Sequence, residues 1–227
     1  MKKDNIFYRI FQLNPYFFSL YFVSLTIGFF HIVFQSHGYL VLWLNQLHNP
    51  VLDLFFKYFT YLGDGIFYAV ALIFFIVHRV RIFLIGLFSF LISGGSAQVL
   101  KHIFNTPRPK LYFLDQHLYF VPGVDVYSNF SLPSGHTATA FSLFLLLSFM
   151  VKYKPLGILF YFMALGVGIS RLYLLQHFFI DVYIGSVLGV LFTVVFYYLI
   201  QTHSYFLSKN WMDKSFLKNN FNSFNNC

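Results

Sequence analysis

The longest uncharged stretch of this chain is the feature that most constrains its fold. Residues 10–52 contain no lysine, arginine, aspartate or glutamate. Within that stretch, residues 16–34 are apolar and, as a helix, long enough to cross the roughly 30 Å of hydrocarbon in a bilayer. Of the whole chain, 58% is hydrophobic and only 10% is charged, whereas soluble domains carry about a quarter charged residues. We therefore expect an all-α polytopic membrane protein and not a soluble domain.

Five more apolar runs follow, separated by short polar segments. The six predicted spans are residues 16–34, 65–80, 82–100, 136–150, 156–170 and 179–200. Apolar and charged residues alternate over 50–62, which predicts a helix lying at the membrane interface, with a simple connecting helix as the alternative. Residues 101–132 are the longest polar interval, and their prolines and glycine oppose regular structure. The expected fold is a six-transmembrane-helix bundle with an interfacial helix and an extended loop between the third and fourth spans.

The basic residues orient this arrangement. Ten of the fifteen fall on one side of it: Lys2, Lys3, Arg9, Arg79, Arg81, Lys152, Lys154, Lys209, Lys214 and Lys218. The positive-inside rule makes that side cytoplasmic, with both termini on it. We expect a cytoplasmic segment at 1–15, a six-helix domain at 16–200 and a loose, polar cytoplasmic tail at 201–227. The expected location is the inner membrane of a bacterial-type cell.

Net charge and cysteine content exclude some classes of function. The formal net charge of +8 could attract nucleic acid, but the placement of the charges follows the membrane orientation, so we expect no nucleic-acid partner. The single cysteine is Cys227. It permits neither an intrachain disulfide nor a metal site built from several cysteines.

Three short polar blocks lie where apolar runs begin or end, all on the predicted outer face. They are Lys101-x6-Arg108-Pro109, Pro133-Ser134-Gly135-His136 and Ser170-Arg171-x5-His177-x3-Asp181. Three cations at one membrane level repel one another unless an anion lies between them. A phosphate fits, because its oxygens accept paired hydrogen bonds from a guanidinium and a point charge from lysine. The alternative is that the long side chains of Lys101 and Arg171 extend to the membrane interface only to keep their charges in water.

The second block predicts a helix start capped by Ser134. The first N–H groups of a helix and its dipole attract anions, and Gly135 lets the backbone approach one closely. His136 then projects from the first turn. Without the other blocks, an ordinary capped helix would explain this segment equally well.

The third block places His177 and Asp181 four residues apart, so that on a helix they would share a face. A carboxylate bound to one imidazole nitrogen makes the other more basic. His177 is therefore a candidate nucleophile toward phosphorus, and a structural hydrogen bond between spans is the alternative. In this scheme His136 is the general acid, while Lys101, Arg108, Arg171, Ser134 and Gly135 bind the phosphate. We expect no metal and no cofactor, because the acidic residues form no cluster of the kind that Mg²⁺ uses.

The three blocks together resemble the signature of the type 2 phosphatidic acid phosphatase superfamily, histidine phosphatases related to vanadium haloperoxidases. Leu62-Gly63-Asp64-Gly65 and Asp181-Val182-x2-Gly185-x3-Gly189 are also similar to that family, so the resemblance covers roughly residues 45–195. Leu175-Gln176 before His177 and Phe178-Phe179 after it depart from the family's usual residues. The resemblance implies a membrane phosphatase without metal, with His177 as nucleophile, His136 as acid and Asp181 as the partner of His177.

The expected substrate is a lipid phosphate monoester or pyrophosphate of the phosphatidic acid, phosphatidylglycerophosphate, undecaprenyl pyrophosphate or lipid A type. Two other functions stay open. One is transfer of a phosphate or head group between lipids through the same intermediate, and the other is a non-enzymatic anion or lipid carrier. Which lipid is used, and the oligomeric state, do not follow from the sequence.

Overall fold

The computed structural model describes residues 6–213, and every regular element in that range is helical. In chain order the elements are α1 (Ile6–Leu13), α2 (Pro15–Phe34), α3 (Tyr39–Gln46), α4 (Pro50–Phe59), the 3-10 helix η1 (Thr60–Gly63), α5 (Gly65–His78), α6 (Val80–Phe104), α7 (Pro109–Tyr112), α8 (Gly135–Met150), α9 (Leu156–Tyr173), α10 (Phe179–Thr202), α11 (Ser204–Leu207) and the 3-10 helix η2 (Asn210–Asp213). The predicted all-α class is confirmed. Lys2, Lys3, Lys214, Lys218 and the far part of the predicted tail lie outside the described residues.

All six predicted spans coincide with helices, but they are not equally suited to cross a membrane. By length and composition α2, α6, α9 and α10 qualify individually. The segment Pro50–Gly63 and α5 qualify only as a pair, bent by 50° at their junction. Helix α8 has only 16 residues. The described chain therefore holds four candidate spans, or five with the bent pair, and the predicted number of six is not confirmed.

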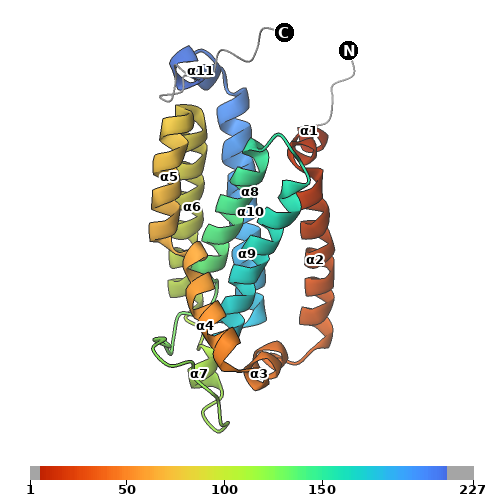
Figure 1. Ribbon diagram of the computed structural model, residues 1–227, viewed down its shortest axis with the longest axis vertical. Helices are drawn as coiled ribbons and strands as arrows, with labels where there is room; N and C mark the ends of the chain where they lie inside the picture. The colour runs from red at the N-terminus through yellow and green to blue at the C-terminus, as the bar shows by residue number, and fades with distance from the viewer. Residues whose placement is uncertain (1–5, 214–227) are drawn as a thin grey trace.

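Helix α8 is the centre of the bundle, which explains how so short an apolar helix is accommodated. Its residues from Thr137 to Leu146 are all buried, and it contacts α6, α9 and α10, which run alongside it (Figure 1). A Cβ atom on Gly189 of α10 would lie 2.3 Å from the carbonyl oxygen of Ala138. The two helices therefore meet at backbone distance, which only glycine permits.

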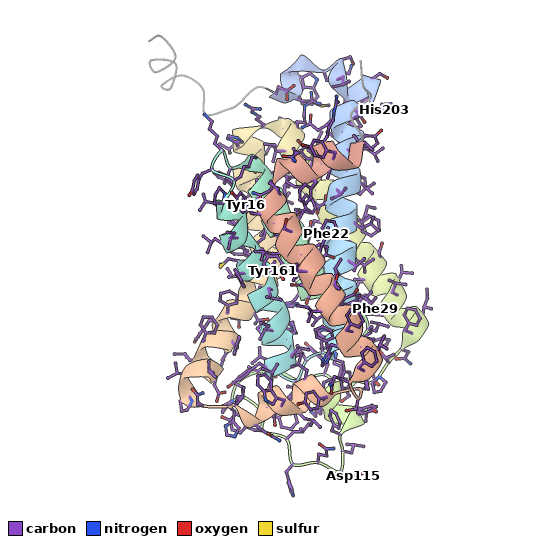
Figure 2. All side chains as sticks on the ribbon, turned by 90° about the vertical axis from the view of Figure 1, so that its right-hand side faces the viewer. Tyr16, Phe22, Phe29, Asp115, Tyr161 and His203 are labelled. Carbon is purple, nitrogen blue, oxygen red and sulfur yellow. The ribbon has the colours of Figure 1, made fainter. Side chains whose placement is uncertain are left out.

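Outside this centre, the surface of the bundle is apolar. On α2, Phe22 and Phe29 point outward and are 53% and 56% exposed, whereas Tyr161 of α9 points inward and is 2% exposed (Figure 2). Aromatic side chains of this size on the outside of a helix are typical of a surface that faces lipid. Inside, hydroxyl groups are paired, as with Tyr68, which donates to the carbonyl oxygen of Gly86 at 3.1 Å.

Helix starts follow local signals that the sequence carries. Asn14 caps α2 and Asn49 caps α4, each followed by a proline in the first turn, and Ser134 caps α8 as predicted. Asn14 also donates to the carbonyl oxygens of Ser148 and Lys154, at 3.0 and 3.1 Å. That buried amide joins the start of α2 to the turn between α8 and α9.

One polar contact was not predicted, and one sequence expectation needs correction. Asp53 of α4 is buried and accepts hydrogen bonds from the hydroxyls of Tyr119 and Tyr173, at 2.8 and 2.6 Å. The described part of the tail is not loose, because Arg81 donates to both carboxylate oxygens of Asp213 at 2.8 Å. In both cases a long-range polar partner decides the position of a segment.

The two ends of the bundle differ. Helices α1 and α11 lie at one end, and α3, α7 and the long loop between α6 and α8 lie at the other (Figure 1). All three polar blocks belong to the second end, because α6, α9 and the segment before α8 reach it there.

Candidate functional site

The second and third blocks meet where α8 and α10 begin. The backbone N–H of Ser134 donates to the carbonyl oxygen of Asp181 at 2.9 Å. A Cβ atom on Gly185 would lie 2.5 Å from the carbonyl oxygen of Ser134. The two helix starts are therefore in direct backbone contact, which brings His136 and His177 to the same end of the bundle.

His177 lies in the connection between α9 and α10, and not on a helix face as the four-residue spacing suggested. Phe178 caps α10, and Asp181 occupies the third position of its first turn. His177 Nδ1 lies 3.4 Å from Asp181 Oδ2, with both side chains 2% exposed. The expected contact between His177 and Asp181 therefore forms at the N-terminal cap of α10. Because Nδ1 faces the carboxylate, Nε2 is the ring nitrogen that could act as a nucleophile.

Asp181 is held by more than the histidine. Its Oδ2 atom accepts a hydrogen bond from Ser131 Oγ at 2.5 Å and another from the N–H of Phe178 at 2.8 Å. These donors fix the carboxylate beside the imidazole. Sequence reasoning missed Ser131, which stands just before the Pro133-Ser134-Gly135-His136 block in a loop that carries no periodic signal.

The surroundings of His177 keep its ring neutral. Burial lowers its pKa well below the ordinary histidine value, and the positive charges of Arg108, Arg171 and Lys101 lower it further. A neutral imidazole keeps the lone pair that a nucleophile needs. The same three cations act on His136, so the charged groups of all three blocks influence both histidines.

Arg171 has N–H donors that are still unused. It lies in the last turn of α9, and Nη1 donates to Thr60 Oγ1 at 2.8 Å. Its Nε is buried and has no hydrogen-bond partner among residues 6–213. A buried, unpaired guanidinium N–H is costly, and a bound anion would relieve that cost.

Arg108 differs from Arg171, because most of its donors are already used. Its Nη1 donates to the carbonyl and the side-chain oxygen of Gln176, at 3.0 and 2.9 Å. Its Nε donates to the carbonyl of Asn129 at 3.0 Å, and Nη2 donates to that of Phe130 at 3.4 Å. In this structure the Arg108 guanidinium is therefore bound mainly to the protein, and its role in phosphate binding stays a prediction. Gln176, which departs from the family's usual residues, accepts two of these hydrogen bonds and so fixes the Arg108 guanidinium.

The start of α8 supplies main-chain donors, although not from Ser134. That residue is fully buried, its Oγ accepts from the N–H of Thr137, and its own N–H is used by Asp181. The N–H groups of Gly135 and His136 have no recorded acceptor among the described residues. A Cβ atom on Gly135 would meet nothing within 4 Å, so there is room in front of this helix start for an anion.

Lys101 and His136 complete the cluster. Lys101 lies in the last turn of α6, which continues past the predicted end of the span to Phe104. His136 Nε2 lies 3.7 Å from Oδ2 of Asp64, and both side chains are about one-third exposed. The cluster is therefore open on the side of His136 and closed around His177.

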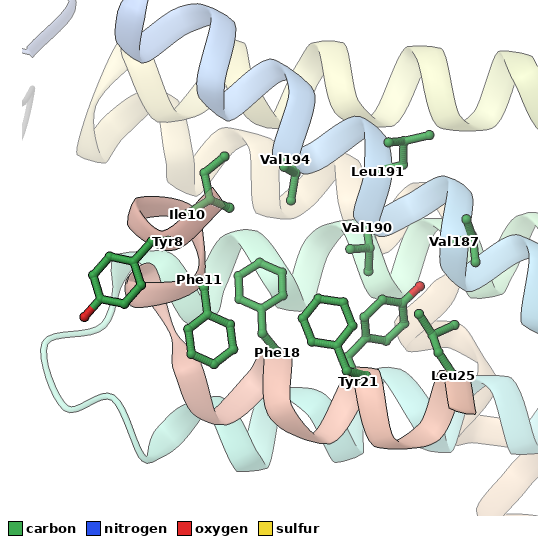
Figure 3. A pocket seen from close by; sticks show the side chains of 11 residues that line it. Tyr8, Ile10, Phe11, Phe18, Tyr21, Leu25, Val187, Val190, Leu191 and Val194 are labelled. Carbon is green, nitrogen blue, oxygen red and sulfur yellow. The ribbon is translucent and has the colours of Figure 1, made fainter. Parts of the chain in front are cut away.

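Neither a metal cluster nor an apolar cavity competes with this cluster as the reactive centre. Within residues 6–213 no three His, Cys, Asp or Glu side chains gather in a way that could hold a metal ion. An apolar cavity of about 510 Å³ lies between α1, α2 and α10, where Phe18 and Tyr21 face Val190 and Val194 (Figure 3). Apart from Tyr8 and Tyr21 its lining is aliphatic or phenylalanine, so it offers no cation to bind the oxygens of a phosphate.

Comparison with known proteins agrees with this geometry. The profile of the PAP2 superfamily matches residues 80–205, a range that includes all three blocks. A dihydrosphingosine 1-phosphate phosphatase from Schizosaccharomyces pombe is 29% identical over 161 residues, which are 63% of this chain and 36% of that protein. The chain thus spans about a third of the length of this curated relative.

Two solved structures share the fold. LpxE from Aquifex aeolicus superposes with a TM-score of 0.63 at 28% identity, covering 70% of this chain and 93% of LpxE. A PAP2-type phosphatidylglycerolphosphate phosphatase from Bacillus subtilis superposes with a TM-score of 0.56 at 24% identity, covering 81% of this chain and 98% of that protein. The second likeness concerns the fold alone.

Proposed function

Because the chain belongs to the PAP2 superfamily, we propose that it is an integral membrane phosphatase that hydrolyses a lipid phosphate monoester or pyrophosphate. One observation carries the proposal. A buried, neutral His177 lies beside Asp181, at the end of the bundle where Arg171 and the start of α8 offer unused N–H donors. A nucleophile and donors for the oxygens of a phosphate are what such a reaction requires.

The first half of the reaction transfers the phosphoryl group to the enzyme. His177 Nε2 attacks phosphorus, forming a P–N bond as the P–O bond to the lipid breaks. Asp181 stabilises the positive charge that develops on the imidazole, and Arg171, Lys101 and the N–H groups of α8 stabilise the phosphate oxygens. The departing oxygen takes a proton from His136 and leaves as the lipid alcohol or, from a pyrophosphate, as the lipid monophosphate.

The second half regenerates the enzyme. Water attacks the phosphohistidine, and His136, now neutral, accepts the proton of that water. The P–N bond breaks, inorganic phosphate leaves, and His177 is again neutral. Every step uses side chains of this cluster, so we propose a reaction that needs neither metal nor cofactor.

The proposed substrate is a phosphate carried by a lipid, reached from the bilayer. The relative from S. pombe acts, by its name, on dihydrosphingosine 1-phosphate, which places sphingoid phosphates beside phosphatidic acid among the first compounds to test. The lipid bilayer is the partner that the apolar surface requires. We propose no nucleic-acid partner, and the oligomeric state is left open.

For the membrane orientation, we propose cytoplasmic termini and a site on the outer face of an inner membrane. Helices α1 and α11 lie at the end opposite the site (Figure 1). Five basic residues lie at the site end, and three of them, Lys101, Arg108 and Arg171, belong to the polar blocks, whereas Arg79, Lys152 and Lys154 lie in turns at the other end. That asymmetry is what the positive-inside rule describes.

The test is product analysis with purified protein in lipid nanodiscs. Phosphatidic acid, dihydrosphingosine 1-phosphate, phosphatidylglycerophosphate, undecaprenyl pyrophosphate and a lipid A phosphate are each supplied with labelled phosphate. Free inorganic phosphate from wild type and none from His177→Ala supports hydrolysis. A labelled new lipid indicates transfer, and anion or lipid binding that is unchanged in His177→Ala, without turnover, indicates a carrier.

A further inference from the structure

Asp64 is a site carboxylate to which no role has been given so far. It caps α5, directly after η1, and its Oδ2 atom lies 3.7 Å from His136 Nε2. The close approach is built into the backbone, because a Cβ atom on Gly63 would lie 2.6 Å from the carbonyl oxygen of His136. With glycine at that position, η1 contacts the first turn of α8, and the next residue reaches the imidazole.

The two carboxylate oxygens of Asp64 have separate partners. Oδ1 accepts the N–H of Ile66 at 2.7 Å and so performs the cap. Oδ2 is the atom that faces His136. A capping function therefore accounts for one oxygen only, and any residue with a single acceptor oxygen could perform it.

The charges around His136 explain why a carboxylate matters at this place. Burial of the imidazole opposes its protonated form, and so do the positive charges of Arg171 from α9, Lys101 from α6 and Arg108 from the start of α7. His177, from the connection before α10, also faces this ring and is neutral. Among residues 6–213, Asp64 is the one carboxylate recorded within ion-pair distance of that ring, and it also interacts with Arg171.

We propose that Asp64 is a positioning residue that acts through His136: its carboxylate stabilises the imidazolium form and so maintains the proton that the leaving oxygen takes. This inference rests on the proposed phosphatase function. When the P–O bond breaks, the proton passes from His136 to the lipid oxygen, and the imidazole becomes neutral. When water attacks the phosphohistidine, the ring takes a proton back, and Asp64 is again beside an imidazolium. Asp64 itself neither gains nor loses a proton.

The decisive variant is Asp64→Asn, because asparagine caps a helix as well as aspartate does but carries no charge. Its matched control is Asp115→Asn, which removes one carboxylate at the tip of the outer loop, away from the cluster (Figure 2). Asp64→Ser, a second capping residue, replaces Asp64→Asn if the latter does not fold.

The readout compares two leaving groups. A lipid alkoxide needs a proton to depart, whereas p-nitrophenolate leaves without one. Since general acids contribute about 100- to 10,000-fold, Asp64→Asn should lower kcat/KM, which reports the phosphoryl-transfer half, by about 10- to 100-fold for lipid phosphate and by less than about 3-fold for p-nitrophenyl phosphate. The alkaline limb of the kcat/KM profile should move to lower pH. Equal losses for both substrates, or an unchanged limb, would overturn the proposal.

A measurement independent of turnover separates this inference from the proposed function. NMR of histidine labelled with ¹⁵N, with the His136 signal identified from its loss in His136→Gln, should show His136 protonating at lower pH in Asp64→Asn than in wild type or Asp115→Asn. An unchanged midpoint overturns the role of Asp64 even if the enzyme is a phosphatase. If the midpoint of His136 shifts but the protein releases no phosphate, the ion pair between Asp64 and His136 stands. The proposed phosphatase reaction is then overturned.

Discussion

Ser131 donates a hydrogen bond of 2.5 Å to Asp181, from the loop before α8 to the first turn of α10. It joins two segments 50 residues apart in the chain, and both atoms are buried. The oxygen that accepts it is also the one beside His177 Nδ1. The orientation of the nucleophile therefore depends on a hydroxyl in a loop.

Removing that hydroxyl should slow the reaction without unfolding the protein. A hydrogen bond to a charged group contributes about 1.5–3 kcal/mol, so Ser131→Ala should lower kcat by roughly 10- to 100-fold if the whole contribution acts in the transition state. Kinetics of phosphate release measure this. Ser128→Ala is the control, because the contact of Ser128 with Arg108 is through its main chain. Equal kcat values in the two variants would contradict the role of Ser131.

The two histidines should each be indispensable for lipid substrates, but for different reasons. His177→Ala removes the nucleophile and should lower kcat by several orders of magnitude on every substrate. His136→Ala removes the acid and should lower kcat/KM, which reports the phosphoryl-transfer half, far more for lipid phosphates than for p-nitrophenyl phosphate, whereas loss of the base for the second half lowers kcat on both. His203→Ala, at the opposite end of the bundle (Figure 2), is the control. Activity near that of wild type in His177→Ala would exclude the phosphohistidine route.

The two site arginines should respond differently to replacement by lysine. Arg171 has a buried, unpaired Nε, so Arg171→Lys removes donors meant for substrate and should reduce kcat/KM by about 100-fold or more while the melting temperature changes little. Arg108 binds the carbonyl groups of Asn129 and Phe130. Arg108→Lys should therefore lower the melting temperature as well. The reverse pattern would show that Arg108 is the main phosphate ligand.

The pH dependence follows from the pKa of His177, which burial and the neighbouring cations lower. The reactive form is the neutral one, so activity should fall with decreasing pH only below the usual histidine value of about 6.5. The unfolded chain binds the proton more readily than the folded one. The same shift therefore adds to folding stability above about pH 6.5 and is lost as the pH falls below that value.

Removing one of the cations tests the cause of that shift. Lys101→Met should move the acid limb of kcat/KM to higher pH, because one positive charge facing His177 is gone. Lys57→Met is the control, since Lys57 donates to the carbonyl of Pro122 in the long loop between α6 and α8. An acid limb that stays in place in Lys101→Met would mean that burial alone sets the pKa of His177.

Two glycines within long helices test the packing of the site. Gly185→Ala would place a Cβ 2.5 Å from the carbonyl oxygen of Ser134 and push α10 away from the start of α8, whereas Gly94→Ala meets nothing within 4 Å. Alanine favours a helix over glycine by about 1 kcal/mol, so Gly94→Ala should keep or raise the melting temperature. Gly185→Ala should lower both melting temperature and kcat. Similar behaviour of the two would contradict the close contact between α8 and α10.

The local sequence was sufficient to locate the helices of the bundle and several of their starts. Runs of apolar residues predicted α2, α6, α9 and α10, and an asparagine, aspartate or serine stands at the cap of several helices because its side chain accepts the free N–H groups of a first turn. The PAP2 signature was likewise readable, since its residues keep fixed spacings. These features depend on neighbours a few positions apart.

Only the tertiary structure decided which partner each polar residue of the site binds. Ser134 and Arg108 were expected to face substrate, yet the N–H of Ser134 donates to Asp181 and the Arg108 guanidinium donates to Gln176. Asp53 is likewise bound by Tyr173 of another helix. Ser131 and Asp64 carried no predicted role, yet they lie against Asp181 and His136. A buried donor or acceptor binds whichever partner the packing brings near it. These partners come from segments far apart in the chain, so the residue spacing within one segment does not predict them.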